Sequence, residues 1–376
     1  MLNRRLLKSL DYTFLFVVLL ILGLSLLILS SATANIGTDP LFYVKKQILW
    51  IGLGLVAVFV MLSFDYAKLL RFERVIYGLV IVSLAAVLFI GHASRGARQW
   101  ISLGPFLLQP SEFGKILMVV CFASYLVRRQ GELQRFRDLL PCFLYFSAPL
   151  LLVLAQPDLG TGLVFVAILF GMLFLAGARP LLLFGLLGGG LAAFALALAL
   201  HFSPLHLPLP LKEYQIARLV VFINPYRDPQ GAGYHIIQSL VAIGSGGPWG
   251  KGLYRGSQVQ LNFLPEHHTD FIFSVVGEEL GFVGASFLLF LYFNLLNRTL
   301  QVAFQSRDLF GRLLAGGIVS MWLFHILENI GMTIGLMPIT GIPLPFLSYG
   351  GSFMLTNMIA LGLILNVHMR REKILF

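Results

Sequence analysis

Long apolar stretches separated by short polar segments run along the whole chain. Ten of them approach the roughly 17 to 25 residues that an α-helix needs to cross a bilayer. They lie at residues 12–31, 47–63, 75–91, 112–127, 139–156, 159–176, 181–201, 271–293, 313–335 and 352–368. We therefore expect an all-α polytopic membrane protein, with about ten transmembrane helices in a single domain over residues 1–376.

The composition agrees with a chain whose main solvent is lipid. Hydrophobic residues make up 58% of the 376 residues and charged residues only 12%, whereas an ordinary soluble domain is about 25% charged. A soluble enzyme and a disordered chain are both excluded, because the first needs a polar surface and the second needs few apolar residues. The two cysteines, Cys121 and Cys142, fall inside predicted spans, which excludes a disulfide-stapled scaffold.

The distribution of charge predicts the topology. The net charge is +10, but the basic residues form small clusters and not one long run, so we expect no nucleic-acid partner. With the N-terminus in the cytoplasm, the inner segments hold most of the basic side chains, at residues 4–8, 68–74, 128–137, 179, 298–312 and 370–373. The positive-inside rule therefore predicts that both termini are cytoplasmic. The stretch 12–31 is too long for a signal-peptide core and predicts a retained span.

A long extracellular loop, residues 202–270, joins the seventh and eighth predicted spans. Apolar residues recur at helical spacing over 216–223, which predicts a short helix, either in the outer membrane interface or packed on the bundle. A second short helix is expected over 234–243. The glycines at 244–247 favour a helix stop over a phosphate cradle, because the lysine and serine of a P-loop are absent.

A polar run over residues 256–270 leads directly into the eighth span and ends at Asp270. A carboxylate at this boundary is partly dehydrated and lies near a helix N-terminus, which suits a general base. The alternative is that Asp270 caps the helix, with Thr269 as a competing cap. A metal site at His267 and His268 is not favoured, because adjacent side chains of an extended run point in opposite directions.

Other polar residues fall at membrane depth, where ionisable groups are functional candidates by default. Lys115 is three residues from Glu112, which predicts an ion pair on one helix face; the pair either joins helices or faces a polar cavity. His325 and Glu328 are also three apart and are expected to satisfy each other. Three further expectations follow from composition: glycines 188–190 serve close helix packing, the proline-rich stretch 337–352 is not helical, and Ser348 and Ser352 in that stretch line a cavity.

Four sequence motifs carry a resemblance to a known family. They are GAGYHIIQS at 231–239, QLNFLPE at 260–266, GEELG at 277–281 and MPITGIPLPFLSYGGS at 337–352. With them the whole chain resembles the SEDS family of cell-wall polymerases (shape, elongation, division and sporulation). The first two motifs are more similar to the elongation subfamily, RodA, than to the division subfamily, FtsW.

The resemblance implies a ten-span bundle in the bacterial cytoplasmic (inner) membrane that polymerises peptidoglycan glycan strands from lipid II on the outer face, for cell elongation and rod shape. It implies β-1,4 linkages formed with inversion and release of undecaprenyl diphosphate, and a class B penicillin-binding protein as partner, beside the nascent glycan strand and membrane lipid. By this resemblance Asp270 is the catalytic base. The expected substrate contacts are Arg98, Trp100, Glu112, Lys115, Glu266, His268 and Ser348. For Trp100, an interfacial anchor is the simpler explanation.

Two other functions remain open from the sequence. A lipid II flippase needs a polar path to the cytoplasmic side, whereas the charged residues named above gather at the outer face. A non-catalytic scaffold for a transpeptidase needs no acid at position 270. The sequence assigns no cofactor and no metal site, and a divalent cation could assist the diphosphate.

Overall fold

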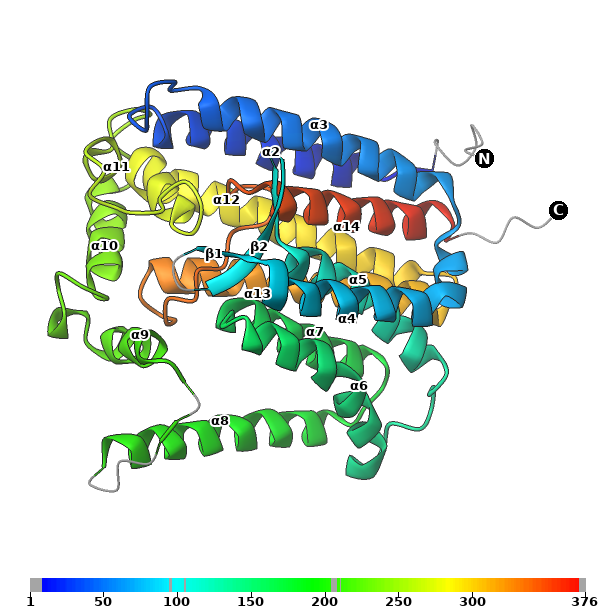
Figure 1. Cartoon of the computed structure of the whole chain (residues 1–376). Coiled ribbons are helices and arrows are strands. Elements are labelled where there is room, and N and C mark those ends of the chain that lie inside the picture. Colours follow the sequence, from blue (N-terminus) through cyan, green and yellow to red (C-terminus); the bar gives the residue numbers. More distant parts are fainter. Residues whose placement is uncertain (1–8, 95–96, 105, 204–207, 210, 372–376) are drawn as a thin grey trace.

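The structure is a computed structural model that describes residues 9–94, 97–104, 106–203, 208–209 and 211–371. Long helices form one bundle, in which the start of α2 and the end of α14 lie side by side, with Ser9 Oγ donating to Met369 O at 3.4 Å (Figure 1). The helices of the bundle are α2 (Tyr12–Ala32), α3 (Phe42–Ser63), α4 (Glu73–Ile90, preceded by the 3-10 helix η1, Tyr66–Phe72), α5 (Pro110–Val127), α6 (Phe136–Ala155), α7 (Leu159–Leu175), α8 (Pro180–Phe202), α12 (Ile272–Gln305), α13 (Leu309–Thr333) and α14 (Gly351–Met369).

The helix content confirms the predicted fold class. In the described ranges, nine helices are long and apolar enough to cross a membrane, and α7, with 17 residues, is a shorter apolar helix at the sixth predicted span. The basic clusters predicted at residues 4–8 and at Lys373 lie outside the described residues.

The loop between α8 and α12 folds into short helices at the end of the bundle opposite the chain termini (Figure 1). These helices are α9 (Glu213–Ile223), η2 (Pro225–Arg227), α10 (Tyr234–Gly246) and α11 (Ser257–Gln260). Both short helices that the sequence predicted are present. A small apolar cluster attaches this layer to the bundle, through Ile236, Leu264, Phe271, Met332 and Ile339.

A three-stranded antiparallel sheet between α4 and α5 was not predicted. Its strands, β1 (His92–Ser94), β2 (Ala97–Leu103) and β3 (Phe106–Leu108), pair in the order β1-β2-β3. The sequence analysis assigned no secondary structure to these residues, because runs this short leave little alternation to detect.

Helix α12 is longer than predicted and is kinked. It runs for 34 residues, and Gly281 has non-helical dihedral angles, φ 65° and ψ −164°. At the kink, Phe282 N donates to Gly247 O at 2.9 Å, and a Cβ on Gly281 would lie 2.2 Å from Gly250 N. Glycine is therefore needed at 281 for both its backbone conformation and the close approach of the loop.

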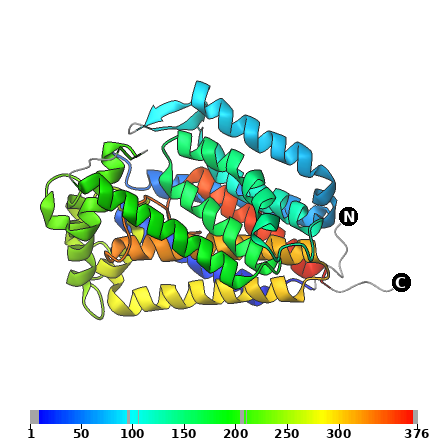
Figure 2. The ribbon, with the colours of Figure 1, turned by 90° about the horizontal axis from the view of Figure 1, so that it is seen from below.

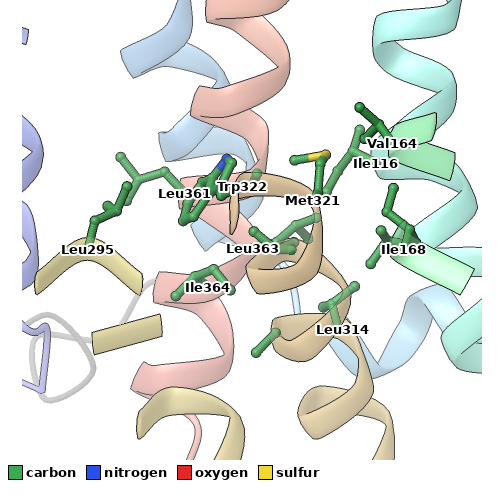
Figure 3. Packing of buried hydrophobic residues seen from close by; sticks show 14 of the residues in the cluster. Ile116, Val164, Ile168, Leu295, Leu314, Met321, Trp322, Leu361, Leu363 and Ile364 are labelled. Atoms are coloured by element: carbon green, nitrogen blue, oxygen red, sulfur yellow. The ribbon is translucent and has the colours of Figure 1, made fainter. Parts of the chain in front are cut away.

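The centre of the bundle is apolar and closely packed. In Figure 3, buried side chains of α5, α7, α12, α13 and α14 pack together, and Trp322 among them is fully buried. Lipid supplies no hydrophobic force between helices, so close packing through small residues is the main source of their association. Between α7 and α13, a Cβ added to Gly171 would lie only 2.0 Å from Ser320 Oγ and 2.7 Å from Ser320 Cβ.

The expectation that glycines 188–190 serve close helix packing is wrong. They lie in α8 at the edge of the bundle (Figures 1 and 2), and a Cβ on any of the three would meet nothing within 4 Å among the described residues. Composition predicted packing because small residues often mark interfaces, but contact requires a neighbouring helix at that position.

These contrasting glycines allow a stability test. We expect Gly171→Val to separate α7 from α13 and to destabilise the protein by about 1–3 kcal/mol, the usual range for overpacking. Gly189→Val introduces the same β-branched residue into a helix but has no neighbour to displace. Thermal unfolding of the two variants in detergent should show a lower Tm for Gly171→Val only; equal melting temperatures would contradict the packing described here.

Candidate active site

The segment that carries Asp270 has no regular secondary structure, and its backbone is fixed by donors from other parts of the chain. Three consecutive carbonyl oxygens each accept a hydrogen bond from a residue far along the sequence. The bonds are Tyr349 N to His268 O at 3.1 Å, Ser348 Oγ to Thr269 O at 2.7 Å, and Asn329 Nδ2 to Asp270 O at 2.7 Å. The position of Asp270 is thus set through its main chain.

The two histidines before Asp270 have separate surroundings. The ring nitrogens of His267 lie 2.5 Å from Leu264 O and 2.7 Å from Ala32 O, which attaches the segment to the end of α2. The His268 ring lies against Tyr43, with centroids 4.9 Å apart, and against Tyr349 at 6.0 Å. Among the described residues, no group of three or more His, Cys, Asp or Glu is placed to hold a metal ion.

Asp270 is not the cap of the helix that follows. Helix α12 begins at Ile272 with Phe271 at its N-cap, so the capping alternative for Asp270 and Thr269 is wrong. The half-buried Asp270 carboxyl lies instead beside Gly341, where an added Cβ would be 3.2 Å from Asp270 Oδ2. Gly341 has a φ of +77°, so glycine is favoured there by conformation and by proximity.

One face of α13 contacts the irregular segment 339–343. His325, Glu328 and Asn329 are three and four residues apart and so share that face. Their partners are Pro343 O, 3.0 Å from His325 Nδ1; Thr340 Oγ1, which donates to Glu328 Oε1; and Ile342 O, which accepts from Asn329 Nδ2 at 2.6 Å. The expectation that His325 and Glu328 satisfy each other is wrong, because each bonds to a different residue of the loop.

The predicted pair of Lys115 and Glu112 is confirmed, and a third residue joins it. Lys115 Nζ lies 2.8 Å from Glu112 Oε1 and 3.1 Å from His325 Nε2, and all three side chains are buried. Because His325 Nδ1 faces a carbonyl oxygen, we assign the proton to Nδ1, which leaves Nε2 to accept from Lys115. Lys115 therefore links α5 to α13 in this conformation.

The remaining predicted contacts lie in different settings. Ser348 is fully buried, and its hydroxyl accepts from Leu344 N at 2.9 Å while donating to Thr269 O, which favours a positioning role over substrate contact. Glu266 has a left-handed backbone, φ 52°, and Trp100 pairs with His92 in the sheet. The backbone of Arg98 lies in β2, but its side chain is outside what the structure describes.

Three residues of this region were missed by the sequence analysis: Asn329, Thr340 and Arg218. Arg218, in α9, donates from Nη1 to Ile339 O at 3.3 Å, which attaches α9 to the residue before Thr340. A polar side chain in the apolar stretch 313–335 was the only available signal for Asn329. The partners of Asn329 lie 13 and 59 positions away in the sequence, so only the folded structure identifies them.

Comparison with known proteins decides the family. The profile of the FtsW/RodA/SpoVE family, described as cell cycle protein, matches residues 10–373. The chain belongs to this family. The resemblance to the SEDS family is therefore confirmed. The motifs around Asp270 and in the stretch 337–352 both fall within the residues that the family profile matches.

Similarity extends over nearly the full length of individual relatives. The chain is 38% identical to stage V sporulation protein E of Bacillus subtilis over 367 residues, 95% of this chain and 96% of that protein. It is also 38% identical to peptidoglycan glycosyltransferase MrdB of Escherichia coli K12 over 365 residues, 97% and 95% of the two chains. A chain in a solved peptidoglycan synthase complex that coordinates polymerization and crosslinking superposes with a TM-score of 0.79 at 35% identity, covering 96% of this chain and 98% of that one.

The buried Lys115–Glu112 pair generates a stability prediction. Lys115→Met leaves the Glu112 carboxylate buried without its cation, and breaking a buried pair in this way costs about 3–5 kcal/mol. We expect a clear fall in Tm in detergent. Adding Glu112→Gln to the same chain removes the stranded charge and should recover part of the loss. A double variant no more stable than Lys115→Met would contradict the pairing.

Proposed function

We propose that this chain is a peptidoglycan glycosyltransferase that polymerises glycan strands from lipid II. The observation that carries the proposal is the fixed position of Asp270, whose main-chain carbonyl is held by Asn329 and whose carboxyl lies beside Gly341. A general base must be held in one place to act on a bound hydroxyl. The similarity to MrdB, which is named as a peptidoglycan glycosyltransferase, supports the same reaction.

In the proposed reaction, the 4-hydroxyl of a GlcNAc attacks the anomeric carbon of a MurNAc. Asp270 accepts the hydroxyl proton as the new C–O bond forms, and the bond from the anomeric carbon to the diphosphate breaks. A single displacement turns the α-linked diphosphate into a β-1,4 glycosidic bond, and undecaprenyl diphosphate leaves. The acceptor hydroxyl and the leaving diphosphate must therefore lie on opposite sides of the anomeric carbon.

The leaving diphosphate needs positive charge. Arg98 and Lys115 remain the predicted contacts, although the Lys115 ammonium is already shared between Glu112 and His325. A divalent cation would have to take most of its ligands from the diphosphate and from water, because the described residues offer no group of three or more candidate ligands.

We place the reaction on the outer face of the cytoplasmic membrane, with both chain termini in the cytoplasm. Ion pairs involving arginine lie at the termini end of the bundle: Arg307 with Asp65 at 3.0 Å, Arg298 with Asp11 at 3.7 Å, and Arg128 with Glu73. The layer of α9 to α11 lies at the opposite end, and so does the start of α12, which Asp270 precedes by two residues (Figure 1). This asymmetry agrees with the positive-inside rule.

A flippase would need a polar route between the two ends of the bundle. The layer between Lys115 and the termini end is filled by apolar side chains, among them Leu314, Met321 and Leu361 (Figure 3). We therefore favour chemistry at the outer end over transport through the bundle.

The proposal includes a class B penicillin-binding protein as partner. The chain in the peptidoglycan synthase complex has the same fold, and that complex is described as coordinating polymerization and crosslinking. We assign the chain to the elongation subfamily because its motifs at 231–239 and 260–266 are more similar to those of RodA. Overall identity does not separate the subfamilies, since it is 38% both to the sporulation protein and to MrdB.

The base assignment is tested by Asp270→Asn, which keeps the size of the side chain and removes its ability to accept a proton. We expect the purified variant, alone and with its class B partner, to fold normally and to make no glycan polymer from lipid II. Asp39→Asn is the matched control, because Asp39 is an outer-face carboxylate whose exposed pair with Lys45 is worth little. Equal polymer from wild type and Asp270→Asn would refute the base; no polymer from the wild type in either condition would favour the flippase or scaffold.

The topology is tested by labelling with a membrane-impermeant maleimide in intact cells. The native Cys121 and Cys142 are fully buried and should stay unlabelled. A cysteine at the exposed position of Gln230 should react in intact cells, whereas one at the exposed position of Glu132 should react only after permeabilisation. The reverse pattern would place the proposed site in the cytoplasm.

A further inference from the structure

A cavity of about 430 Å³ lies at the end of the bundle that holds the chain termini, opposite the layer of α9 to α11 (Figure 1). It is bounded by the start of α2, the last turns of α12 and the end of α14. That volume falls in the range of roughly 300–1,000 Å³ that is usual for small-molecule sites. The glycan reaction proposed above uses none of the residues around this cavity, which include Asp11, Tyr12, Arg298, Gln301, His368 and Arg371.

The charged groups that line the cavity are two arginines and one aspartate. Arg298 Nη1 lies 3.7 Å from Asp11 Oδ2, which is longer than a hydrogen bond. The other oxygen of this carboxylate, Asp11 Oδ1, accepts from Phe14 N at 3.0 Å. Arg371 Nη1 lies 3.0 Å from His368 Nδ1. Because a guanidinium carries five N–H donors, both arginines retain donors for an anion, and the lining has an excess of positive charge.

The neighbouring arginines are directed elsewhere. Arg370 donates to Asn366 Oδ1 and, at 3.3 Å, to Leu62 O, and Arg307 is paired with Asp65 at 3.0 Å. Two neutral amides complete the polar lining on α12. Gln301 and Gln305 lie three and seven residues after Arg298, so all three side chains share one helix face. Amide N–H groups on this face can donate to the same anion as Arg298.

Exposed apolar side chains begin at the cavity and continue along two of its helices toward the middle of the bundle. On α2, Phe16 and Leu19 follow Tyr12 at helical spacing, and all three are exposed. On α12, Phe290 and Phe293 precede Gln301 in one exposed stripe. These two helices pack against each other. A lipid with its headgroup in the cavity would therefore place its acyl chains on apolar side chains, whereas a free phosphate would leave them unused.

We propose that this cavity binds the phosphodiester headgroup of an anionic phospholipid. Arg298 and Arg371 contact the phosphate oxygens, and the acyl chains lie along Tyr12 and Phe16. Basic pockets between transmembrane helices suit such headgroups, because the arginines meet the phosphate at the depth where the apolar surface begins. The bound lipid joins α2, α12 and α14 and stabilises the folded bundle. The inference goes beyond glycan synthesis and does not depend on it.

The test is a lipid titration of the purified full chain, delipidated in a neutral detergent and followed by native mass spectrometry. The probes are phosphatidylglycerol, zwitterionic phosphatidylethanolamine and inorganic phosphate. We expect wild type to bind one phosphatidylglycerol at least tenfold more tightly than either other probe. Arg298→Gln/Arg371→Gln should weaken that binding about tenfold to thirtyfold, because each basic residue near an anionic lipid contributes about fivefold.

Two further variants separate loss of the site from loss of the fold. Gln301→Glu keeps both arginines, adds a negative charge at an exposed position, and should weaken phosphatidylglycerol binding to a similar extent. Arg71→Gln/Arg74→Gln removes the same two charges from exposed positions outside the cavity and should match wild type. The melting temperature without lipid checks that each variant is folded.

The outcomes that would overturn the inference are specific. Wild-type affinity for phosphatidylglycerol in both cavity variants would show that the lipid binds elsewhere. Equal affinity for phosphatidylethanolamine would remove the role of charge. Equal affinity for inorganic phosphate would assign the cavity to a soluble anion and overturn the lipid. Weakened binding in Arg71→Gln/Arg74→Gln to the same extent would reduce the effect to net charge.

Discussion

The need to satisfy irregular backbone inside a membrane protein is the constraint on which the rest of this structure depends. Water is scarce at membrane depth, so every peptide group outside a helix must bond within the protein. The chain from His268 to Asp270 meets this requirement with donors from Tyr349, Ser348 and Asn329. These bonds join the start of α12, one face of α13 and the proline-rich segment, and they fix Asp270 without using its carboxyl group.

Helix α13 has two kinds of contact along its length. Near its C-terminal end, His325, Glu328 and Asn329 bond to the 339–343 segment and, through His325, to Lys115. Toward its other end, its side chains enter the apolar centre of the bundle (Figure 3). The polar layer at the end opposite the chain termini thus packs against a close-packed apolar layer, which limits how far its side chains can move. Asp270 and its neighbours are therefore held in one arrangement.

Glycine at points of close approach is the second recurring feature, with backbone atoms as the neighbours of Gly281 and the Asp270 carboxyl as the neighbour of Gly341. Gly281 admits the loop after α10 at the kink of α12, and Gly341 admits the proline-rich segment beside Asp270. In both cases the residue also has a positive φ, so a side chain would clash and strain the backbone at once.

The sequence by itself determined the features that depend on local pattern. Apolar runs specified the spans, helical spacing specified α9, and the three-residue separation specified the Lys115–Glu112 pair, because its members are adjacent on any helix. Which groups meet across the bundle was decided only by the tertiary structure. His325 bonds to Lys115, 210 positions away, and not to Glu328, while an added Cβ on glycines 188–190 would contact no other described residue. Such contacts depend on how the helices are arranged relative to one another. That arrangement results from the packing of all the helices together, so no local sequence pattern reveals it.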